Sequence, residues 1–452
     1  MILKRYYWRF KSAIEDYPRN FWTLMVASFI DRLGAFILFP FFTLYITSRF
    51  GVGMTTVGFI FGTFSITSLF GSTIGGALTD RIGRKPMLVF GLIASAISSI
   101  WLGFADNLTV FFTGAVFVGL LSNVGGPAQQ AMMADILPDS QRAQGFAIWR
   151  VVINVSAALG PAIGGLLASR SYLSLFITDA LISVLVAILI TSLLPETRAQ
   201  IKKREQESML QTFRGYGRVL RDAAFMFFWL AAVFTWTVYM QMNSTLAVYL
   251  RDTHGISEQG FGYLLSMNAI LVVALQFAIT RRMERYPPFL VMASGALLYA
   301  IGFSMYGFTS DYSYFVLAMI VITIGEMLIA PIGQAIVANL APADMRGRYM
   351  AFFGFSFTIP GIVSTLLAGL IMDNADPRLV WYAAGLLGLI ATGMYVSMHG
   401  RVLAKLKRKH LIRNLPSPHS AGIFSSLPTC RGQIERQPKA ASTLRDAVLA
   451  LS

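Results

Sequence analysis

Three ionisable side chains lie inside long apolar stretches of the sequence, where they could carry a proton. Asp31 and Arg32 are about ten residues into the first stretch, or roughly 15 Å along a helix, and Glu326 is at the middle of a later one. An apolar medium disfavours a charged carboxylate, whereas a neighbouring guanidinium favours it. A conformational change that alters either effect would load or release a proton, so these residues are the candidates for proton coupling. Asp179, which is shallower, ranks below them, and a static pair of Asp31 with an arginine that only fixes helix packing is the alternative.

A substrate cavity would need polar and aromatic side chains at similar depths, and several apolar stretches contain them. The candidates for its lining are Arg150, Asn154, Trp236, Tyr239, Gln241, Asn243, Asn268 and Gln276, with Phe39, Phe42, Met240, Met242 and Met267 as apolar neighbours. Such a lining, apolar and aromatic with few charges, suits amphipathic or hydrophobic substrates. Each aromatic ring could instead contact lipid or a neighbouring helix, and Arg150 could extend to the membrane surface.

The composition indicates which elements must position these residues. Of the 452 residues, 55% are hydrophobic and 13% are charged, whereas soluble proteins carry about 25% charged residues. Apolar runs of about 20 residues recur along the chain, and such runs are typical of membrane helices, whose backbone satisfies its own hydrogen bonds. They predict twelve membrane spans, at residues 21–47, 53–79, 87–104, 109–134, 146–168, 173–195, 223–250, 258–280, 288–308, 313–340, 347–372 and 379–399.

The positive charge predicts how the spans are oriented. Of the 37 Lys and Arg residues, 31 fall in segments on the side of the two termini and four fall in loops on the other side. Positively charged loops stay in the cytoplasm, so we expect a cell-membrane protein with both termini cytoplasmic. The net charge of +15 therefore reflects membrane orientation, and no nucleic-acid-binding motif accompanies it.

Two features divide the chain into parts. Pro195 and the charges after it end the sixth span, and an offset of 204 residues relates positions of the two halves across four spans. The matched residues include Tyr45 and Tyr249, Gly51 and Gly255, Gly58 and Gly262, Pro127 and Pro331, Ala134 and Ala338, and Arg142 and Arg346. Such a parallel repeat indicates two equivalent six-helix halves. We expect a cytoplasmic segment at 1–20, an N-terminal half at 21–197, a basic cytoplasmic linker at 198–222, a C-terminal half at 223–400 and a basic, mostly disordered cytoplasmic tail at 401–452.

The strongest motif lies between the second and third spans, from Gly76 to Lys85. Gly83 permits a tight turn, and Asp80 can cap a helix or pair with a guanidinium. The pattern Gly-x-x-x-Asp-Arg-x-Gly-Arg-Lys resembles the signature loop of the major facilitator superfamily at every defined position. Together with the spans and the repeat, the resemblance covers about residues 15–400. It implies an all-α polytopic membrane protein with twelve transmembrane helices in two six-helix halves, the major facilitator fold.

In this family the loop works as a latch that ties the second span to the eleventh when the outside of the transporter is open. The resemblance implies that the latch residues here are Gly76, Asp80, Arg81, Gly83, Arg84 and Lys85, with Asp135 and Arg142 as local charge partners. The matching segment of the second half keeps only Glu284 and Arg285, so one working latch is expected. An arginine that relatives carry in the fourth span is missing, because Ala115 is about where it would fall.

A second motif, in the fifth span, consists of Gly160, Pro161, Gly164 and Gly165. The proline removes a backbone donor and can kink the helix, and the glycines leave a flat face for close packing. The pattern resembles the Gly-Pro-x-x-Gly-Gly motif that marks the exporters of the superfamily, and this resemblance favours export over uptake. Ordinary packing of small residues is the alternative.

Other classes of function lack their characteristic residues. The sequence contains no Gly-x-x-x-x-Gly-Lys-Ser/Thr loop, no nucleophile elbow and no His-Glu-x-x-His motif, so neither ATP-driven transport nor an enzyme is expected. Cys430 is the one cysteine and the four histidines are scattered, so we expect no metal site and no cofactor. The coupling ion would be H⁺.

The sequence therefore predicts a secondary transporter that works by alternating access, in which the two halves rock about a central site. It would export small amphipathic or hydrophobic compounds in exchange for protons, as a monomer whose partners are its small-molecule substrate and the lipid bilayer. Proton symport that imports a sugar, peptide or organic anion is the alternative. A non-transporting membrane sensor with the same fold is a more remote one.

Overall fold

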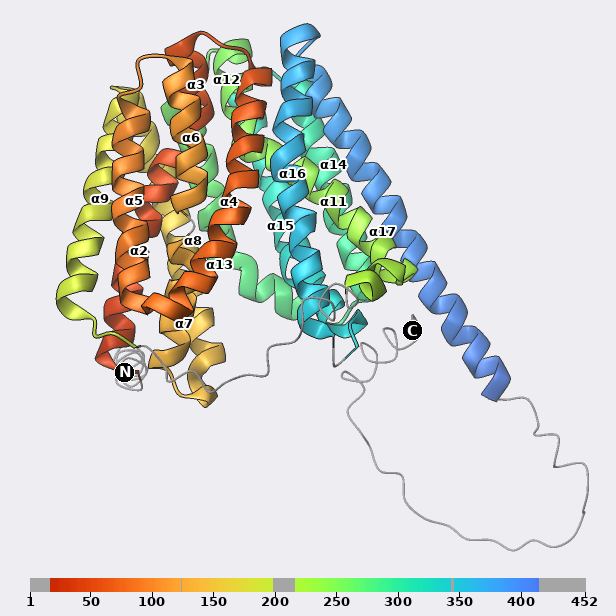
Figure 1. Cartoon of the computed structure of the whole chain (residues 1–452). Helices are drawn as coiled ribbons and strands as arrows, with labels where there is room; N and C mark the ends of the chain where they lie inside the picture. The colour runs from red at the N-terminus through yellow and green to blue at the C-terminus, as the bar shows by residue number, and fades with distance from the viewer. Residues whose placement is uncertain (1–16, 123, 198–215, 343–344, 414–452) are drawn as a thin grey trace, which may run out of the picture.

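All regular elements are helices in the part of the chain that this computed structural model describes, residues 17–122, 124–197, 216–342 and 345–413 (Figure 1). The first half contains α2 (Arg19–Leu38), the 3-10 helix η1 (Phe39–Phe41), α3 (Phe42–Phe50), α4 (Met54–Ile82), α5 (Arg84–Gly103), α6 (Leu108–Ser122), α7 (Gly125–Ile136), α8 (Asp139–Ala168) and α9 (Tyr172–Leu193). The second half contains α11 (Ala223–Ser244), α12 (Leu246–His254), α13 (Glu258–Met283), α14 (Pro288–Phe308), α15 (Tyr312–Leu340), α16 (Arg346–Asn374) and α17 (Arg378–Arg413). Within the described residues they provide 12 helical segments long and apolar enough to cross a membrane, which agrees with the predicted number.

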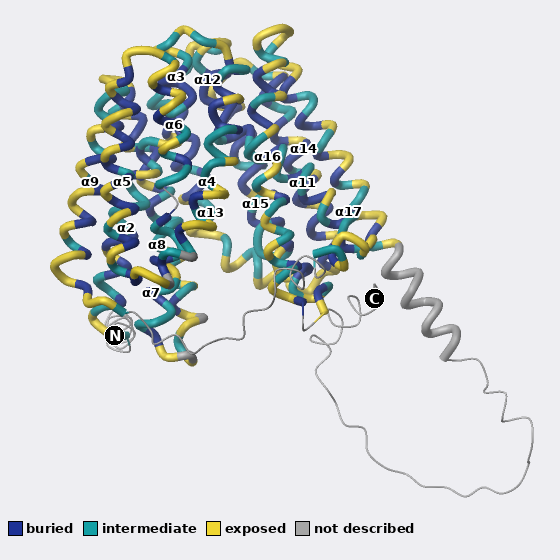
Figure 2. Tube along the Cα trace, viewed as in Figure 1, coloured by how far each residue is buried: buried dark blue, intermediate teal, exposed yellow. Residues whose placement is uncertain are grey.

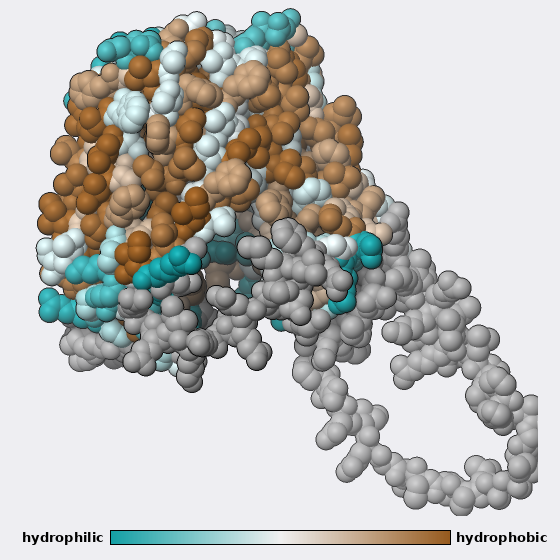
Figure 3. Space-filling model, viewed as in Figure 1, coloured by the Kyte–Doolittle hydropathy of each residue, from teal (hydrophilic) through white to brown (hydrophobic). Residues whose placement is uncertain are grey.

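A broad apolar belt surrounds the molecule. Figure 3 shows hydrophobic residues over the middle of the visible face and hydrophilic residues gathered toward its two ends. Large apolar side chains such as Phe59, Leu181 and Phe277 are 59%, 65% and 78% exposed, and Figure 2 shows exposed positions along the outer helices. A water-soluble protein rarely exposes continuous apolar surface on this scale. The chain is therefore a multi-pass membrane protein of the predicted all-α fold class.

The two halves repeat the same local structure. The first span is broken at η1, where Pro40 supplies no backbone N–H, and α11 is likewise followed after Thr245 by the separate helix α12. α3 ends at Gly51 with φ of 62°, and α12 ends at Gly255 with φ of 65°. Glycine adopts this left-handed conformation without strain. These two glycines are related by the offset of 204 residues, so the repeat in the sequence is also a repeat in the fold.

The halves meet at one end of the molecule, which we call the distal end; the terminal end is the one where α2 begins and α17 finishes (Figure 1). α4 packs against α16, α8 packs against α13, and α3 contacts α12. One cluster of buried apolar residues crosses between the halves and includes Phe41 and Phe261, whose ring centroids are 5.7 Å apart. A separate cluster, which includes Phe21 and Leu194, fills the terminal part of the first half alone. The halves therefore share a core at the distal end and diverge toward the terminal end.

Glycines bring the backbones of the two halves into direct contact at the distal end. A Cβ atom added to Gly165 of α8 would lie 2.9 Å from the carbonyl oxygen of Glu258, and one added to Gly369 of α16 would lie 2.4 Å from that of Met54. Gly165 and Gly369 are themselves 204 residues apart. The two contacts are therefore repeat-related, and each depends on the absence of a side chain.

A second repeat-related pair completes this packing. A Cβ atom added to Gly58 would lie 2.4 Å from the Cα atom of Leu366, and one added to Gly262 would lie 2.3 Å from the carbonyl oxygen of Pro161. No side chain fits at such distances without a shift of the backbone. The distal seal, defined as the contacts of Gly58, Gly165, Gly262 and Gly369 with the opposite half, is therefore built from backbone on backbone.

Polar contacts reinforce the distal seal. The Asp373 carboxylate of α16 accepts hydrogen bonds from the backbone N–H groups of Met54 and Thr55, both at 2.8 Å, and so caps the N-terminus of α4 in the other half. A carboxylate at a helix N-terminus is stabilised by the free N–H groups and by the helix dipole. Arg251 of α12 donates to the carbonyl oxygen of Leu44 at 3.2 Å and to Thr47 Oγ1 at 3.0 Å.

Some boundaries differ from those expected. α17 continues to Arg413, so the expectation of irregular chain is wrong for residues 401–413, which contain helix-forming Leu, Lys and Arg and neither Gly nor Pro. Residues 216–221 of the expected linker are helical, and α8 begins at Asp139 rather than at 146. Residues 1–16, 198–215 and 414–452, which hold most of the expected end segments and linker, lie outside the described residues.

Replacing Gly165 or Gly369 with leucine should separate the halves at the distal end. The side chain has no space against the opposing backbone, and overpacking costs about 1–3 kcal/mol, which corresponds to a shift of about 5- to 150-fold toward the separated arrangement. Double electron–electron resonance between spin labels on Asp106→Cys and Asp311→Cys, two exposed distal positions, should report a longer mean distance in either variant.

Gly354→Leu is the matched control, because a Cβ atom added to this glycine of α16 meets no atom within 4 Å. The measurement uses a Cys430→Ser background, which removes the one native thiol. The same distance in all three variants and the parent would contradict the packing argument.

Candidate functional site

A central cavity of about 180 Å³ lies between the two halves, on the terminal side of the distal seal. Its walls come from the first span, α8, α11, α13 and α15. The lining residues are Phe36, Pro40, Ile153, Asn154, Ala157, Pro161, Tyr239, Met242, Asn243, Leu265, Asn268, Ala269, Val272 and Glu326. The structure therefore brings together five polar residues that the sequence analysis singled out separately: Asn154, Tyr239, Asn243, Asn268 and Glu326.

Glu326 supplies the carboxylate of this cavity, and both of its oxygens accept hydrogen bonds from neutral groups. Tyr239 Oη donates to Oε1 at 3.0 Å, and Asn268 Nδ2 donates to Oε2 at 2.9 Å. Asn268 Nδ2 also lies 2.9 Å from Thr323 Oγ1, and Asn268 is buried, so its amide is held in place. Neutral donors satisfy the carboxylate without cancelling its charge. It can therefore accept a proton or the positive charge of a bound compound.

A second cavity, of about 420 Å³, shares Phe36 and Ile153 with the central one and is lined by Arg32. Arg32 Nη2 donates to Gln129 Oε1 at 3.4 Å, and Arg32 Nε lies 3.7 Å from Asp31 Oδ2. The Asp31 side chain is 26% exposed. Asp31 therefore sits beside a guanidinium, and its role in proton coupling stays a prediction.

Four of the predicted lining residues do not line the central cavity, and two of these, Gln241 and Gln276, form hydrogen bonds elsewhere. Gln241 is buried along α11, where Nε2 donates to the carbonyl oxygen of Thr237 at 3.2 Å and Oε1 accepts from Thr245 Oγ1 at 2.6 Å. Gln276 lies nearer the terminal end and donates to the carbonyl oxygen of Met327 at 3.0 Å. Both amides satisfy their own helix or its neighbour. The sequence shows that such a residue lies in a span. Whether its side chain faces the cavity is known only from its hydrogen-bond partners in the structure.

The remaining two candidates lie beside the cavity. Trp236 lines a separate cavity of about 70 Å³, and its ring centroid is 5.3 Å from that of Tyr239. Arg150 is exposed and precedes Asn154 by four residues, so both lie on the same face of α8. Because α8 runs from the terminal end, Arg150 lies one turn from the cavity on its terminal side.

The signature loop is held within the first half. The Arg84 side chain, which is 9% exposed, places Nε 3.1 Å from Asp135 Oδ2 and Nη1 3.2 Å from the carbonyl oxygen of Thr79. Glu196 lies at the opposite side of the loop and accepts hydrogen bonds from the backbone N–H groups of Arg84, at 2.9 Å, and Lys85, at 3.2 Å. The expected partner Asp135 therefore contacts the loop, and Glu196 caps the N-terminus of α5.

The conformation of Gly83 and the contacts of Lys85 add to this anchoring. Gly83 has φ of 123°, and an added Cβ would lie 2.8 Å from Glu196 Oε2. Lys85 Nζ donates to the carbonyl oxygen of Thr191 at 2.7 Å. Arg81 is exposed, and the side chain of Asp80 lies outside the described residues. In this arrangement the loop is braced by α9, and the latch to the eleventh span stays a prediction.

Arg142 has a structural contact that recurs in both halves. Its Nε donates to the carbonyl oxygen of Ala134 at 2.8 Å, and the Nε of its repeat partner Arg346 donates to that of Ala338 at 3.0 Å. Gly76 has space for a side chain, because an added Cβ would meet only Pro127, at 4.0 Å. The recurrence shows that this contact of Arg142 belongs to the repeated fold.

The span-five motif holds α8 between α2 and α13. A Cβ atom added to Gly160 would lie 2.4 Å from the Cβ of Phe36, and one added to Gly164 would lie 2.4 Å from the carbonyl oxygen of Ile37. Gly165 and Pro161 face α13 in the distal seal. Close packing by itself therefore accounts for the spacing of the motif.

Two capping carboxylates escaped the sequence analysis, Glu196 and Asp373. Each satisfies the first N–H groups of a helix that is distant in the sequence, whereas recognisable capping signals lie within three residues of the helix start. The available signal was indirect: a glycine, Gly83 or Gly53, occupies each N-cap position and offers no capping side chain of its own.

Two six-helix halves around a cavity at mid-depth, joined at one end and divergent at the other, define the fold of a secondary transporter. The sequence model of the Major Facilitator Superfamily matches residues 24–293 and 228–429. The chain belongs to the major facilitator superfamily of membrane transporters.

Similar proteins include transporters of several kinds. The chain is 28% identical over 400 residues to a Na(+), Li(+), K(+)/H(+) antiporter of Planococcus maritimus, with 82% of this chain and 92% of the relative covered. It is 24% identical over 374 residues to the multidrug resistance protein MdtH of Shigella flexneri, with 81% and 90% covered. A solved structure of a POT family transporter in complex with a thioalcohol conjugated peptide matches with a TM-score of 0.71 at 16% identity, over 84% of this chain and 96% of that chain. At that identity the likeness shows the fold alone.

Removing the Glu196 cap should loosen the signature loop. Glu196→Ala leaves two N–H groups of α5 without their acceptor, and loss of a helix cap costs about 0.5–2 kcal/mol. We expect a lower midpoint of thermal unfolding for the purified protein, with Glu196→Gln intermediate because its amide oxygen still accepts a hydrogen bond. An unchanged midpoint in Glu196→Ala would show that the cap contributes nothing to stability.

Proposed function

We propose that the protein exports small amphipathic or hydrophobic compounds in exchange for protons. The observation that carries the proposal is the placement of Glu326 in an otherwise mostly apolar cavity between the two halves. Apolar walls with a few polar groups bind apolar molecules and orient them by a polar or positively charged group. Asn154, Asn243 and Asn268 add hydrogen-bonding groups but no charge.

Exchange follows if a proton and a substrate compete for Glu326. A carboxylate in apolar surroundings is unfavourable unless it is paired or neutralised. A substrate with a positive or hydrogen-bond-donating group can satisfy it in one step of the cycle, and a proton can satisfy it in the other. Asp31, which lies 3.7 Å from Arg32, provides a second place for a proton. The residues of this chain would thus perform the coupling with H⁺ alone and no cofactor.

The orientation of the chain in the membrane decides which side the terminal end faces. With the positively charged segments in the cytoplasm, the terminal end faces the cytoplasm of a cell-membrane protein and the distal seal closes the outside. This conformation then faces the cytoplasm, a state through which exporters and importers both pass. The likeness to an antiporter and to a multidrug resistance protein favours export.

The test is transport by the full chain in liposomes that contain a pH-sensitive dye. A proton gradient is imposed, and lipophilic cations, neutral drugs, sugars and dipeptides are added one at a time. Protons should move in the direction opposite to an amphipathic compound. Protons that move together with a sugar or dipeptide would establish symport instead, and no proton movement with any compound would favour a non-transporting role.

Glu326→Gln should reduce compound-driven proton movement to the level of empty liposomes. The amide has the same size as the carboxylate and can still form hydrogen bonds, but it cannot take up a proton. Asp31→Asn should also abolish coupled movement and leave a folded protein. Glu284→Gln, at an exposed position, is the control and should transport like the parent. Coupled transport at the parent rate at all pH values would remove the substituted carboxylate from the mechanism.

A further inference from the structure

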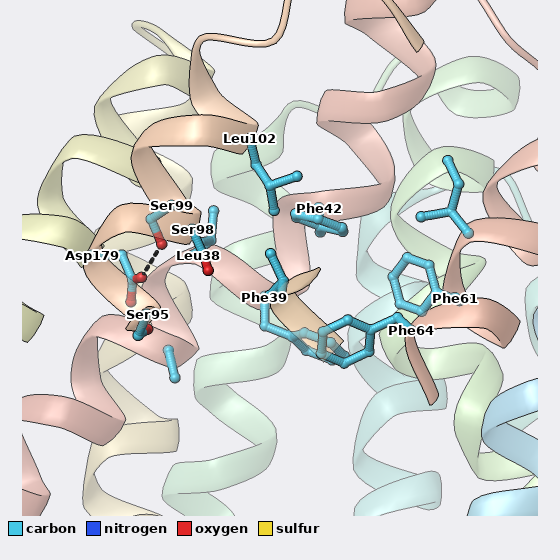
Figure 4. A pocket seen from close by; sticks show the side chains of 13 residues that line it. Leu38, Phe39, Phe42, Phe61, Phe64, Ser95, Ser98, Ser99, Leu102 and Asp179 are labelled. Atoms are coloured by element: carbon cyan, nitrogen blue, oxygen red, sulfur yellow. Dashed lines mark hydrogen bonds between the residues drawn. The ribbon is translucent and has the colours of Figure 1, made fainter. Parts of the chain in front are cut away.

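A cavity inside the first half lies apart from the central one and contains a buried carboxylate. It has a volume of about 170 Å³ and is enclosed by the first span, α4, α5, α6 and α9. Most of its wall is apolar, and Phe39, Phe42, Phe61 and Phe64 contribute their rings (Figure 4). Asp179 of α9 is 7% exposed and lines this wall. Export through the central cavity makes no use of it.

Three serine hydroxyl groups accompany Asp179. Ser95, Ser98 and Ser99 lie three and four residues apart, so they share one face of α5, and all three line the cavity. Ser99 Oγ donates to Asp179 Oδ2 at 2.5 Å. Figure 4 shows the four side chains gathered at one side of the cavity.

Ser98 is the informative member of this group. It is 7% exposed, yet neither Ser98 nor Ser95 has a hydrogen-bond partner among the residues that the structure describes. A serine in a helix usually bonds to the carbonyl oxygen four residues earlier when no other partner is present. Three hydroxyl groups and one carboxylate thus offer oxygen ligands. The hydroxyl groups of Ser95 and Ser98 are not used in hydrogen bonds within the described residues.

The charge around the cluster is one negative unit. Asp31 on α2 is close enough to act on Asp179 and lies 3.7 Å from Arg32, so the three groups together carry one negative unit. Gly34, one turn after Asp31, faces α9, because an added Cβ would lie 3.0 Å from Asp179 Oδ1. In the described part of the chain no Lys or Arg forms an ion pair with Asp179. An isolated charge at such a place is unfavourable, so the cluster needs one positive charge, which a proton or a monovalent cation can supply.

We propose that Asp179, Ser95, Ser98 and Ser99 form a binding site for a small monovalent metal cation, Na⁺ or Li⁺. Hard cations prefer oxygen ligands of this kind. A divalent cation would leave an uncompensated positive charge among apolar walls, whereas a monovalent metal cation matches the charge of the one carboxylate. The site uses none of the residues that line the central cavity, although Asp31, the second place for a proton in the proposed function, acts on it.

The test is equilibrium binding of ²²Na⁺ to the purified full chain, measured by scintillation proximity with choline replacing Na⁺ at constant ionic strength. The parent should bind Na⁺ saturably in the millimolar range, and unlabelled Li⁺ should displace it whereas Mg²⁺ should not. Ser98→Ala, which removes one oxygen ligand, should weaken binding at least about tenfold, equivalent to about 1.4 kcal/mol. Asp179→Asn should abolish it.

Ser294→Ala, in α14, the repeat counterpart of α5, is the control and should bind like the parent. Absence of saturable binding by the parent, or equal affinity in the parent, Ser98→Ala and Asp179→Asn, would overturn the proposal. If Asp179→Asn does not fold, Ser98→Ala and Ser95→Ala decide the question. Because the assay contains neither substrate nor a proton gradient, its result is separate from the outcome of the transport experiment.

Discussion

The close approach of the two halves at the distal end is the contact on which the rest of this conformation depends. At Gly58, Gly165, Gly262 and Gly369 the backbone of one half lies against the other with no room for a side chain. Only at this separation can Asp373 cap α4 and Arg251 reach the carbonyl oxygen of Leu44. The polar contacts are therefore a consequence of the glycine packing, and all of them are lost together if the halves part.

This dependence also explains why the two halves diverge toward the terminal end. The glycine contacts join the halves above the cavity, whereas the signature loop at the terminal end is braced within its own half by Asp135 and Glu196. The carboxylate of Glu196 and that of Asp373 do the same chemical work, since each satisfies the N-terminus of a helix. Glu196 acts inside one half and Asp373 acts between the halves, so only the Asp373 cap depends on the distal seal.

The sequence predicted more of the fold than of the sites. Apolar runs and the loop from Gly76 to Lys85 were sufficient for the twelve spans and the family, because membrane helices must be long and apolar wherever they pack. The grouping of Glu326 with Tyr239 and Asn268 required the structure, since three helices distant in the sequence supply these residues. Gln241 is the opposite case. The sequence placed it in the seventh span, but its side chain forms hydrogen bonds with Thr237 and Thr245 and does not line the cavity.

The repeat supplies the framework but not the chemistry. Gly165 and Gly369, and Arg142 and Arg346, keep the same contacts in both halves. At the same offset of 204 residues, however, Glu326 corresponds to Ser122 and Asp31 corresponds to Thr235. The serines of α5 correspond to Tyr299, Gly302 and Phe303, which pack into the core of α14. The packing contacts between the halves occur in both repeats. The carboxylates of Glu326 and Asp31, in contrast, each occur in one repeat only. The residues that break the repeat are therefore where substrate and ion specificity should be sought in this chain.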